Sequence, residues 1–354
     1  MLVCVGALLV VGHAAQGESK TVVYRPIAET LPDETSDQVL GSSRWQSVTA
    51  ALPGKQRYFA VQGAWLDHTH HVLAAIVARQ PVELEEYTNA ALAIIEVDQG
   101  NVRCRQFLDL FDSKRDYRKP ERLSLPMHAA WKGPWRGFPR YSHASFYSVD
   151  VDGDGISDLV VTLQYSGGSY SPAETFVLRN QARQYQIALS KHGAAGGHIE
   201  FDRVADVDGD GKPEILIWDE IWGAGSHAEA RDWVDIFHWS GDRMVRVNHQ
   251  FPLAYAPVKA GMQEVCKRHP GETPEFYYFL GVVAEYEGNA NEARSYYELS
   301  LSANRWVIPE ERQTYAMVRA AYRGAAKQRL RTLERGPSPN TASQPTPNEG
   351  AAER

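Results

Sequence analysis

Much of the chain alternates short apolar runs with polar turns, which is the pattern of β-strands joined by tight connections. Between Trp45 and about Phe251 these runs are rich in β-branched and aromatic residues, and Gly, Asp and Asn separate them. From about Ala256 to Arg335 the apolar residues recur at helical spacing instead. The pattern predicts a mainly β domain over residues 45–255 and a helical segment over residues 256–335.

The β region repeats internally, in three units of similar form. Each unit has an apolar strand followed by two strands that meet at a tight turn. With one further strand at its start, a unit would have the four strands of a β-propeller blade. Three units are fewer than a closed propeller has, so we predict a partial or small propeller-like stack, or a further degenerate blade in the N-terminal half. The visible units cover residues 72–107, 158–189 and 214–247.

Two stretches, residues 150–158 and residues 206–214, place acidic residues at alternate positions among glycines. Such carboxylates repel one another unless a cation lies between them. Alternate residues of a curled loop can direct their side chains to one centre, and glycine permits the curl. Oxygen ligands without Cys or His select Ca²⁺, whereas Mg²⁺ requires stricter geometry. The alternative is a pair of Asp-Gly turns that bind no ion.

We therefore predict two Ca²⁺ sites, with ligands at loop positions 1, 3, 5, 7 and 9. Position 7, which is Ile156 in the first loop and Lys212 in the second, would contribute its backbone carbonyl. The first site comprises Asp150, Asp152, Asp154, Ile156 and Asp158, and the second comprises Asp206, Asp208, Asp210, Lys212 and Glu214.

These loops are not EF-hands, because an EF-hand needs a Glu at position 12 and helices on both sides. Position 12 is Val161 in one loop and Ile217 in the other, and both lie in β-type sequence. The stretches DVDGDGISDLVV and DVDGDGKPEILI instead resemble the FG-GAP/VCBS repeats of integrin-type β-propellers. The resemblance implies that each loop joins two strands of a blade and holds Ca²⁺. The first unit has WLDHTHHVLAA in place of the loop, which implies that it has lost its site.

Two other stretches carry candidate binding residues. Aromatic and basic residues interleave in WKGPWRGFPRY, a pattern that can bind sugars, proteins or nucleic acid, or that forms an irregular loop pinned by its rings. Its candidate binding residues are Trp131, Trp135, Arg136 and Tyr141. His68, His70 and His71 form either a transition-metal site or a polar loop between strands.

The helical segment resembles one tetratricopeptide (TPR) repeat. Tyr277, Gly281, Ala293 and Tyr297 follow the spacing of that repeat, in which small residues let two helices approach closely. The sequence departs from the pattern at Ala284 and lacks the usual closing proline. The last predicted helix is rich in Arg and Lys, which form either a solvated face or a surface for an acidic partner.

Both ends of the chain differ in composition from its middle. The apolar run Leu2–Val11 is too short to span a membrane, and small residues follow it, as in a signal peptide. We expect a signal peptide over residues 1–19, a linker over 20–44, a disordered tail over 336–354, and export to the periplasm or the medium. Export would permit a disulfide between Cys104 and Cys266, and two buried thiols are the alternative.

The sequence contains no recognisable set of catalytic residues, such as Gly-x-Ser-x-Gly or His-Glu-x-x-His. The net charge of −7 does not favour nucleic acid as a partner. We therefore expect an exported, calcium-binding, non-catalytic protein that acts as a scaffold for another protein. The alternative is a propeller-type hydrolase or a carbohydrate-binding protein whose site lies on the calcium-bearing face.

Overall fold

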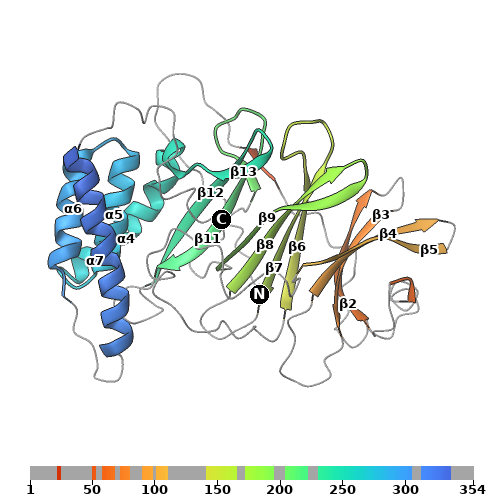
Figure 1. Cartoon of the computed structure of the whole chain (residues 1–354), viewed down its shortest axis with the longest axis horizontal. Helices are drawn as coiled ribbons and strands as arrows, with labels where there is room; N and C mark the ends of the chain where they lie inside the picture. The colour runs from red at the N-terminus through yellow and green to blue at the C-terminus, as the bar shows by residue number, and fades with distance from the viewer. Residues whose placement is uncertain are drawn as a thin grey trace, which may run out of the picture.

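Three antiparallel β-sheets stand in a row, and a group of helices follows at one end (Figure 1). This arrangement is seen in a computed structural model of the chain. The structure describes residues 22–24, 50–52, 58–67, 72–79, 90–98, 101–110, 141–165, 172–194, 204–221, 230–304 and 312–335.

Each sheet is a meander, in which strands that follow one another in sequence lie side by side. The first sheet has the order β2-β3-β4-β5 and the middle sheet has the order β6-β7-β8-β9. The third has the order β10-β11-β12-β13, and the two-residue strand β1 (Val22–Val23) pairs with its outer strand β10. The bounds are Tyr58–Asp67, Val72–Arg79, Ala90–Asp98 and Asn101–Asp109 for β2–β5, Tyr141–Val149, Asp158–Tyr165, Pro172–Gln181 and Gln184–Ala194 for β6–β9, and Val204–Asp206, Glu214–Ile221, Arg231–Ser240 and Arg243–Arg246 for β10–β13.

The middle sheet is apolar on both faces because it is packed on both sides. In β7, Leu159 and Val161 contribute to a core shared with the first sheet, which includes Ile76 of β3. Val160, between them, points to the opposite face and joins a core shared with the third sheet. Successive side chains of a strand point to opposite faces, so a strand buried on both faces needs a continuous apolar run. This requirement explains the Leu-Val-Val run after the first acidic loop.

The middle and third sheets approach one another most closely between β9 and β11. A Cβ added at Gly193 would overlap the backbone carbonyl oxygen of Trp218 and would lie 3.1 Å from Cγ2 of Ile217. Glycine is therefore required by space at this position. The contact fixes how the two sheets that carry the acidic loops sit against each other.

In the described part of the chain, four α-helices follow the third sheet: α4 (Ala256–Arg268), α5 (Pro274–Tyr286), α6 (Ala290–Ser302) and α7 (Arg312–Arg335). Aromatic rings connect this group to the sheet. The ring of Trp233 in β12 lies 5.0 Å from that of Tyr255 and 4.5 Å from that of Phe279 in α5, measured between centroids. Sheet and helices share one continuous apolar core, so the helical segment is part of the same folded body.

The α5–α6 pair is built around Gly281. Residue 281 faces the ring of Tyr297, and a Cβ added there would lie 2.5 Å from its Cε1 atom. The turn between the helices contains Gly288 at φ 74°, and the side chain of Asn289 caps α6 by accepting a hydrogen bond from the backbone N–H of Glu292. The close approach is the one we expected, while the TPR assignment itself stays a resemblance.

The structure confirms a mainly β fold with four-stranded antiparallel units and a C-terminal helical segment. The three sheets do not close into a ring, so the propeller assignment stays a prediction. β1 lies within the segment that we interpreted as a linker. None of the helices in the described ranges is long and apolar enough to cross a membrane.

Candidate metal centres

The first acidic loop, residues 150–158, connects β6 to β7 and curls around the side chain of Asp150. One carboxylate oxygen of Asp150 accepts a hydrogen bond from the backbone N–H of Gly153 at 2.8 Å, and the other accepts one from Gly155 at 2.8 Å. Gly153 and Gly155 have φ angles of 75° and 84°, which side chains other than glycine rarely adopt. The glycines are therefore what allows the backbone to wrap around the first acid.

The second acidic loop, residues 206–214, connects β10 to β11 and repeats this geometry. Asp206 accepts hydrogen bonds from the backbone N–H groups of Gly209 at 2.7 Å and Gly211 at 3.0 Å. The two glycines have φ angles of 77° and 88°. Because the same contacts recur at the same positions in neighbouring sheets, the two loops are structural repeats and not two unrelated turns.

The acid at position 9 closes each loop at the base. Asp158 accepts hydrogen bonds from the backbone N–H of Val151 at 3.0 Å and from that of Asn180 in β8 at 2.7 Å. Glu214 accepts one from the backbone N–H of Val207 at 2.7 Å and shares one with Nδ1 of His238 in β12 at 2.8 Å. Each closing acid therefore ties its loop to the neighbouring strand.

Burial gives both closing acids an unfavourable setting for charge. Burial, together with a smaller effect of the nearby charges of Asp152 and Asp154, raises the pKa of Asp158 to about 6, although the two backbone hydrogen bonds act in the opposite direction. Burial likewise raises the pKa of Glu214, against the hydrogen bonds from Val207 and His238. A positive ion in the loop would offset this cost.

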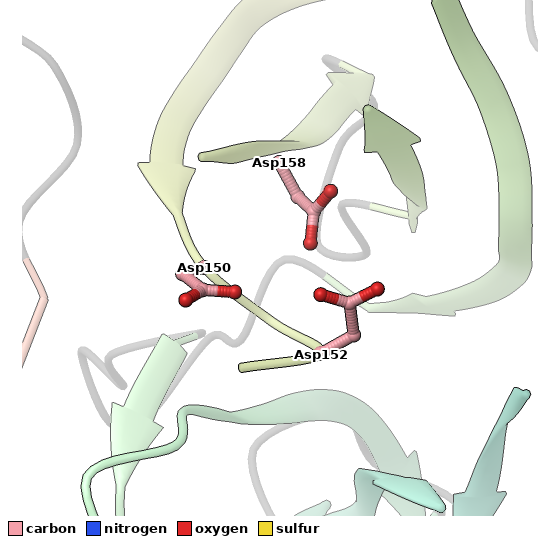
Figure 2. Close-up of side chains that lie close together, drawn as sticks. All are labelled: Asp150, Asp152 and Asp158. Atoms are coloured by element: carbon pink, nitrogen blue, oxygen red, sulfur yellow. The ribbon is translucent and has the colours of Figure 1, made fainter. Parts of the chain in front are cut away.

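Three carboxylates converge in each loop. In the first, Asp150, Asp152 and Asp158 each offer an oxygen, and the three oxygens lie within 4.8 Å of one another (Figure 2). In the second, the corresponding group is Asp206, Asp208 and Asp210. The groups therefore use positions 1, 3 and 9 in one loop and positions 1, 3 and 5 in the other. An all-oxygen donor set of this kind fits Ca²⁺.

The predicted ligands outside these two groups are Asp154, Ile156, Lys212 and Glu214. Asp154 accepts a hydrogen bond from the backbone N–H of Ile156 at 2.8 Å, and Asp210 accepts one from that of Lys212 at 2.8 Å. Glu214, the closing acid of the second loop, is outside its group of three. The two loops thus keep the same backbone, although different acids are gathered in each.

Two basic residues lie beside the first loop, and the sequence analysis anticipated neither contact: it did not single out Arg179, and it assigned Lys212 to the second loop alone. Arg179 in β8 forms an ion pair with Asp152 through Nε, and its Nη2 lies 3.9 Å from Oδ2 of Asp154. The end of Lys212, from the second loop, lies against Gly153, since a Cβ added at Gly153 would be 3.0 Å from Lys212 Cε. The spacing of acids along the chain carries no signal for either contact, because both depend on how strands and sheets are placed.

Several other predicted residues lie outside the described residues or lack a described side chain. Trp131, Trp135 and Arg136 lie outside the described residues, as do His68, His70 and His71. Tyr141 is the first residue of β6, and only its backbone is described. Cys104 and Cys266 are free thiols, so the disulfide that export would permit is not formed.

Residues 150–217 match the sequence model of a family described as FG-GAP-like repeat. The chain contains an FG-GAP-like repeat. The match begins at the first acid of the first loop and ends in β11, just after the second loop, so it includes both candidate centres. No curated protein and no solved structure matches the chain significantly.

Proposed function

We propose that this protein is a calcium-stabilised, non-catalytic scaffold that binds another protein. The observation that carries the proposal is the recurrence of one acidic loop in two neighbouring sheets, each with three converging carboxylates. Ca²⁺ would be held by these groups and would neutralise charges that otherwise destabilise the folded loops.

A structural role fits the position of the loops. Each connects two strands of a sheet, and the two sheets share a core that continues into the helices. Stabilising the loops therefore stabilises the body that presents the outer surfaces. Extracellular calcium modules bind with Kd values of about 10⁻⁴–10⁻³ M, which suffices where calcium is abundant, and this range agrees with the export that the N-terminal sequence predicts.

The choice of a protein partner rests on the FG-GAP-like repeat, because repeats of this family commonly mediate protein contacts. This support is an analogy at the level of the fold. A capture experiment tests it directly: tagged full-length protein is incubated with periplasmic or secreted protein in Ca²⁺ and in EDTA. A specific partner retained in Ca²⁺ and lost in EDTA supports the scaffold, and no specific partner in either condition contradicts it.

The stabilising role is tested by thermal unfolding. At 10 mM, which is about 10–100 times the Kd values of extracellular calcium modules, Ca²⁺ stabilises the folded protein by about 1.4–2.7 kcal/mol for each site, so 10 mM CaCl₂ should raise the Tm well above its value in EDTA. The double variant Asp150→Asn/Asp206→Asn should lose most of this shift. Asp242→Asn, in the exposed turn between β12 and β13, should keep it. Equal Tm values in Ca²⁺ and EDTA for the unmodified protein would refute the role.

A further inference from the structure

We propose that Lys212 serves both acidic loops: its backbone belongs to the second loop, while its side chain places a positive charge on the first loop and weakens Ca²⁺ binding there. The inference rests on the proposed calcium binding. It goes further by making the affinity of one loop depend on a side chain of the other, across the boundary between two sheets.

The end of the Lys212 side chain lies on the backbone of the first loop. A Cβ added at Gly153 would be 3.0 Å from Cε of Lys212, 3.6 Å from its Nζ and 3.7 Å from its Cδ. The last three heavy atoms of the side chain therefore lie across Gly153. The residue at position 7 of the second loop thus extends out of its own loop and contacts the loop of the middle sheet.

Gly153 lies among the predicted ligands of the first loop. It stands between Asp152 and Asp154 in sequence, and its backbone N–H donates a hydrogen bond to Oδ1 of Asp150 at 2.8 Å. Asp150 and Asp152 both belong to the group of three converging carboxylates. An ammonium group beside Gly153 is therefore close to these ligands, where it repels a divalent cation that they hold.

The backbone of Lys212 is held within the second loop. Its N–H donates a hydrogen bond to Oδ1 of Asp210 at 2.8 Å, and Asp210 is one of the three converging carboxylates of that loop. The preceding residue, Gly211, donates its N–H to Asp206 at 3.0 Å. These bonds fix the point from which the Lys212 side chain begins, so its reach to Gly153 follows from the shape of the second loop.

Contacts between the middle and third sheets keep the two loops beside each other. Val151, at position 2 of the first loop, is buried in the core that the two sheets share. Arg179 in β8 pairs with Asp152 of the first loop, and its guanidinium carbon lies 5.1 Å from the centroid of the Trp239 ring in β12. The gap that the Lys212 side chain crosses is therefore set by packing on both sides of it.

The first loop has no equivalent cation at position 7. Its residue there is Ile156, whose uncharged side chain is 45% exposed. Position 7 therefore supplies a charge from the second loop to the first and none in the other direction. Two loops with the same spacing of acids are thus coupled by a residue type that differs between them.

The test follows the two loops separately by NMR, through the amide signals of Gly155 and Gly211. Each N–H donates to the first acid of its own loop, so its signal reports Ca²⁺ at that loop. EDTA-stripped full-length protein with ¹⁵N-glycine is titrated with CaCl₂. Lys212→Met keeps most of the side-chain length and removes the charge, so it should tighten binding at the first loop about threefold. The Kd at the second loop should change by less than about 1.5-fold, because the ammonium group lies against the first.

Matched variants separate charge from shape. Lys212→Gln, a second neutral variant, should reproduce the gain, whereas Lys212→Arg keeps the charge and should change the Kd at the first loop by less than about 1.5-fold. Lys327→Met makes the same substitution at an exposed position of α7 and should leave both Kd values unchanged. Because salt screens exposed charges, the gain in Lys212→Met should be larger at about 50 mM NaCl than at about 500 mM. A purely steric role would not depend on salt.

The outcomes distinguish the inference from the calcium sites on which it rests. If both glycine signals respond to Ca²⁺ but Lys212→Met leaves the Kd at the first loop unchanged, or changes both Kd values equally, the inference is overturned and the calcium sites stand. If neither signal of the unmodified protein responds to millimolar Ca²⁺, the calcium sites are refuted, and the inference with them.

Discussion

The contact between Gly281 and Tyr297 allows a quantitative test of how the helical segment is packed. In Gly281→Ala, the new Cβ would lie 2.5, 2.7 and 2.9 Å from three atoms of the Tyr297 ring. Relief of this overlap requires α5 and α6 to separate by about 1 Å. The ring cannot easily turn away, because it is fully buried and its hydroxyl donates a hydrogen bond to Oε1 of Glu285 at 2.5 Å.

Overpacking of this kind costs about 1–3 kcal/mol, whereas Ala in place of Gly in a helix gains about 1 kcal/mol. Gly324→Ala in α7 is the matched control, since nothing lies within 4 Å of a Cβ added there. The helix-propensity gain is common to both variants, so the difference in their unfolding free energies isolates the steric cost. We expect Gly324→Ala to be more stable than the unmodified protein and Gly281→Ala to be less stable.

The assay is urea unfolding followed by circular dichroism, with both variants and the unmodified protein measured under the same conditions. Gly281→Ala should fall below Gly324→Ala by about 1–3 kcal/mol. If both variants were stabilised to the same extent, the close packing of α5 on α6 would be refuted.

Three further predictions follow from the described contacts. Gly193→Ala should lower the Tm, since the backbone carbonyl of Trp218 cannot move aside as a side chain could, and an unchanged melting curve would contradict the contact between the sheets. In EDTA, folding favours the protonated form of Asp158, so the contribution of this group to stability is complete below about pH 4 and is lost as pH rises through about 6. In Ca²⁺, protons compete with the metal for the carboxylate, so the stabilisation by Ca²⁺ should grow over the same pH range. Parallel melts in EDTA and in Ca²⁺ at several pH values measure both trends. Dithiothreitol should leave the Tm unchanged because Cys104 and Cys266 are free, and a lower Tm would reveal a disulfide.

The acidic loops were predictable from sequence because local chemistry determines their shape. An acid that accepts backbone hydrogen bonds, glycines at positive φ and an apolar run directly afterwards are properties of adjacent residues, and they are sufficient to specify a curled loop that leads into a strand. The fourth strand of each unit was expected on a different ground, because one further strand ahead of each unit gives the four strands of a propeller blade. The repeat in sequence and the repeat in structure therefore coincide.

The selection of carboxylates within each loop was not predictable in this way. The group contains the closing acid Asp158 in one loop and excludes the closing acid Glu214 in the other. The longer side chain of Glu214 reaches His238, and Arg179 reaches Asp152 only because of the register between β7 and β8. These contacts join residues that are far apart in sequence, so the spacing of acids carries no information about them.

The strand β1 illustrates the same limit. Val22 and Val23 lie in a polar segment without a pattern, and they form a strand because β10 offers an open edge of N–H and C=O groups. The neighbouring residue Tyr24 donates its backbone N–H to the carbonyl of Val204 at 3.1 Å. Burial raises the pKa of its hydroxyl, and the negative charges of acids in both loops add smaller effects in the same direction.

The central claim, that both loops hold Ca²⁺, is tested most directly by calorimetric titration of EDTA-stripped full-length protein with CaCl₂ at neutral pH. The account predicts two Ca²⁺ ions per chain, with Kd values of about 10⁻⁴–10⁻³ M. Asp150→Asn/Asp152→Asn and Asp206→Asn/Asp208→Asn should each remove one of the two ions. No binding at millimolar Ca²⁺, or binding that persists when both loops are neutralised together, would contradict the account.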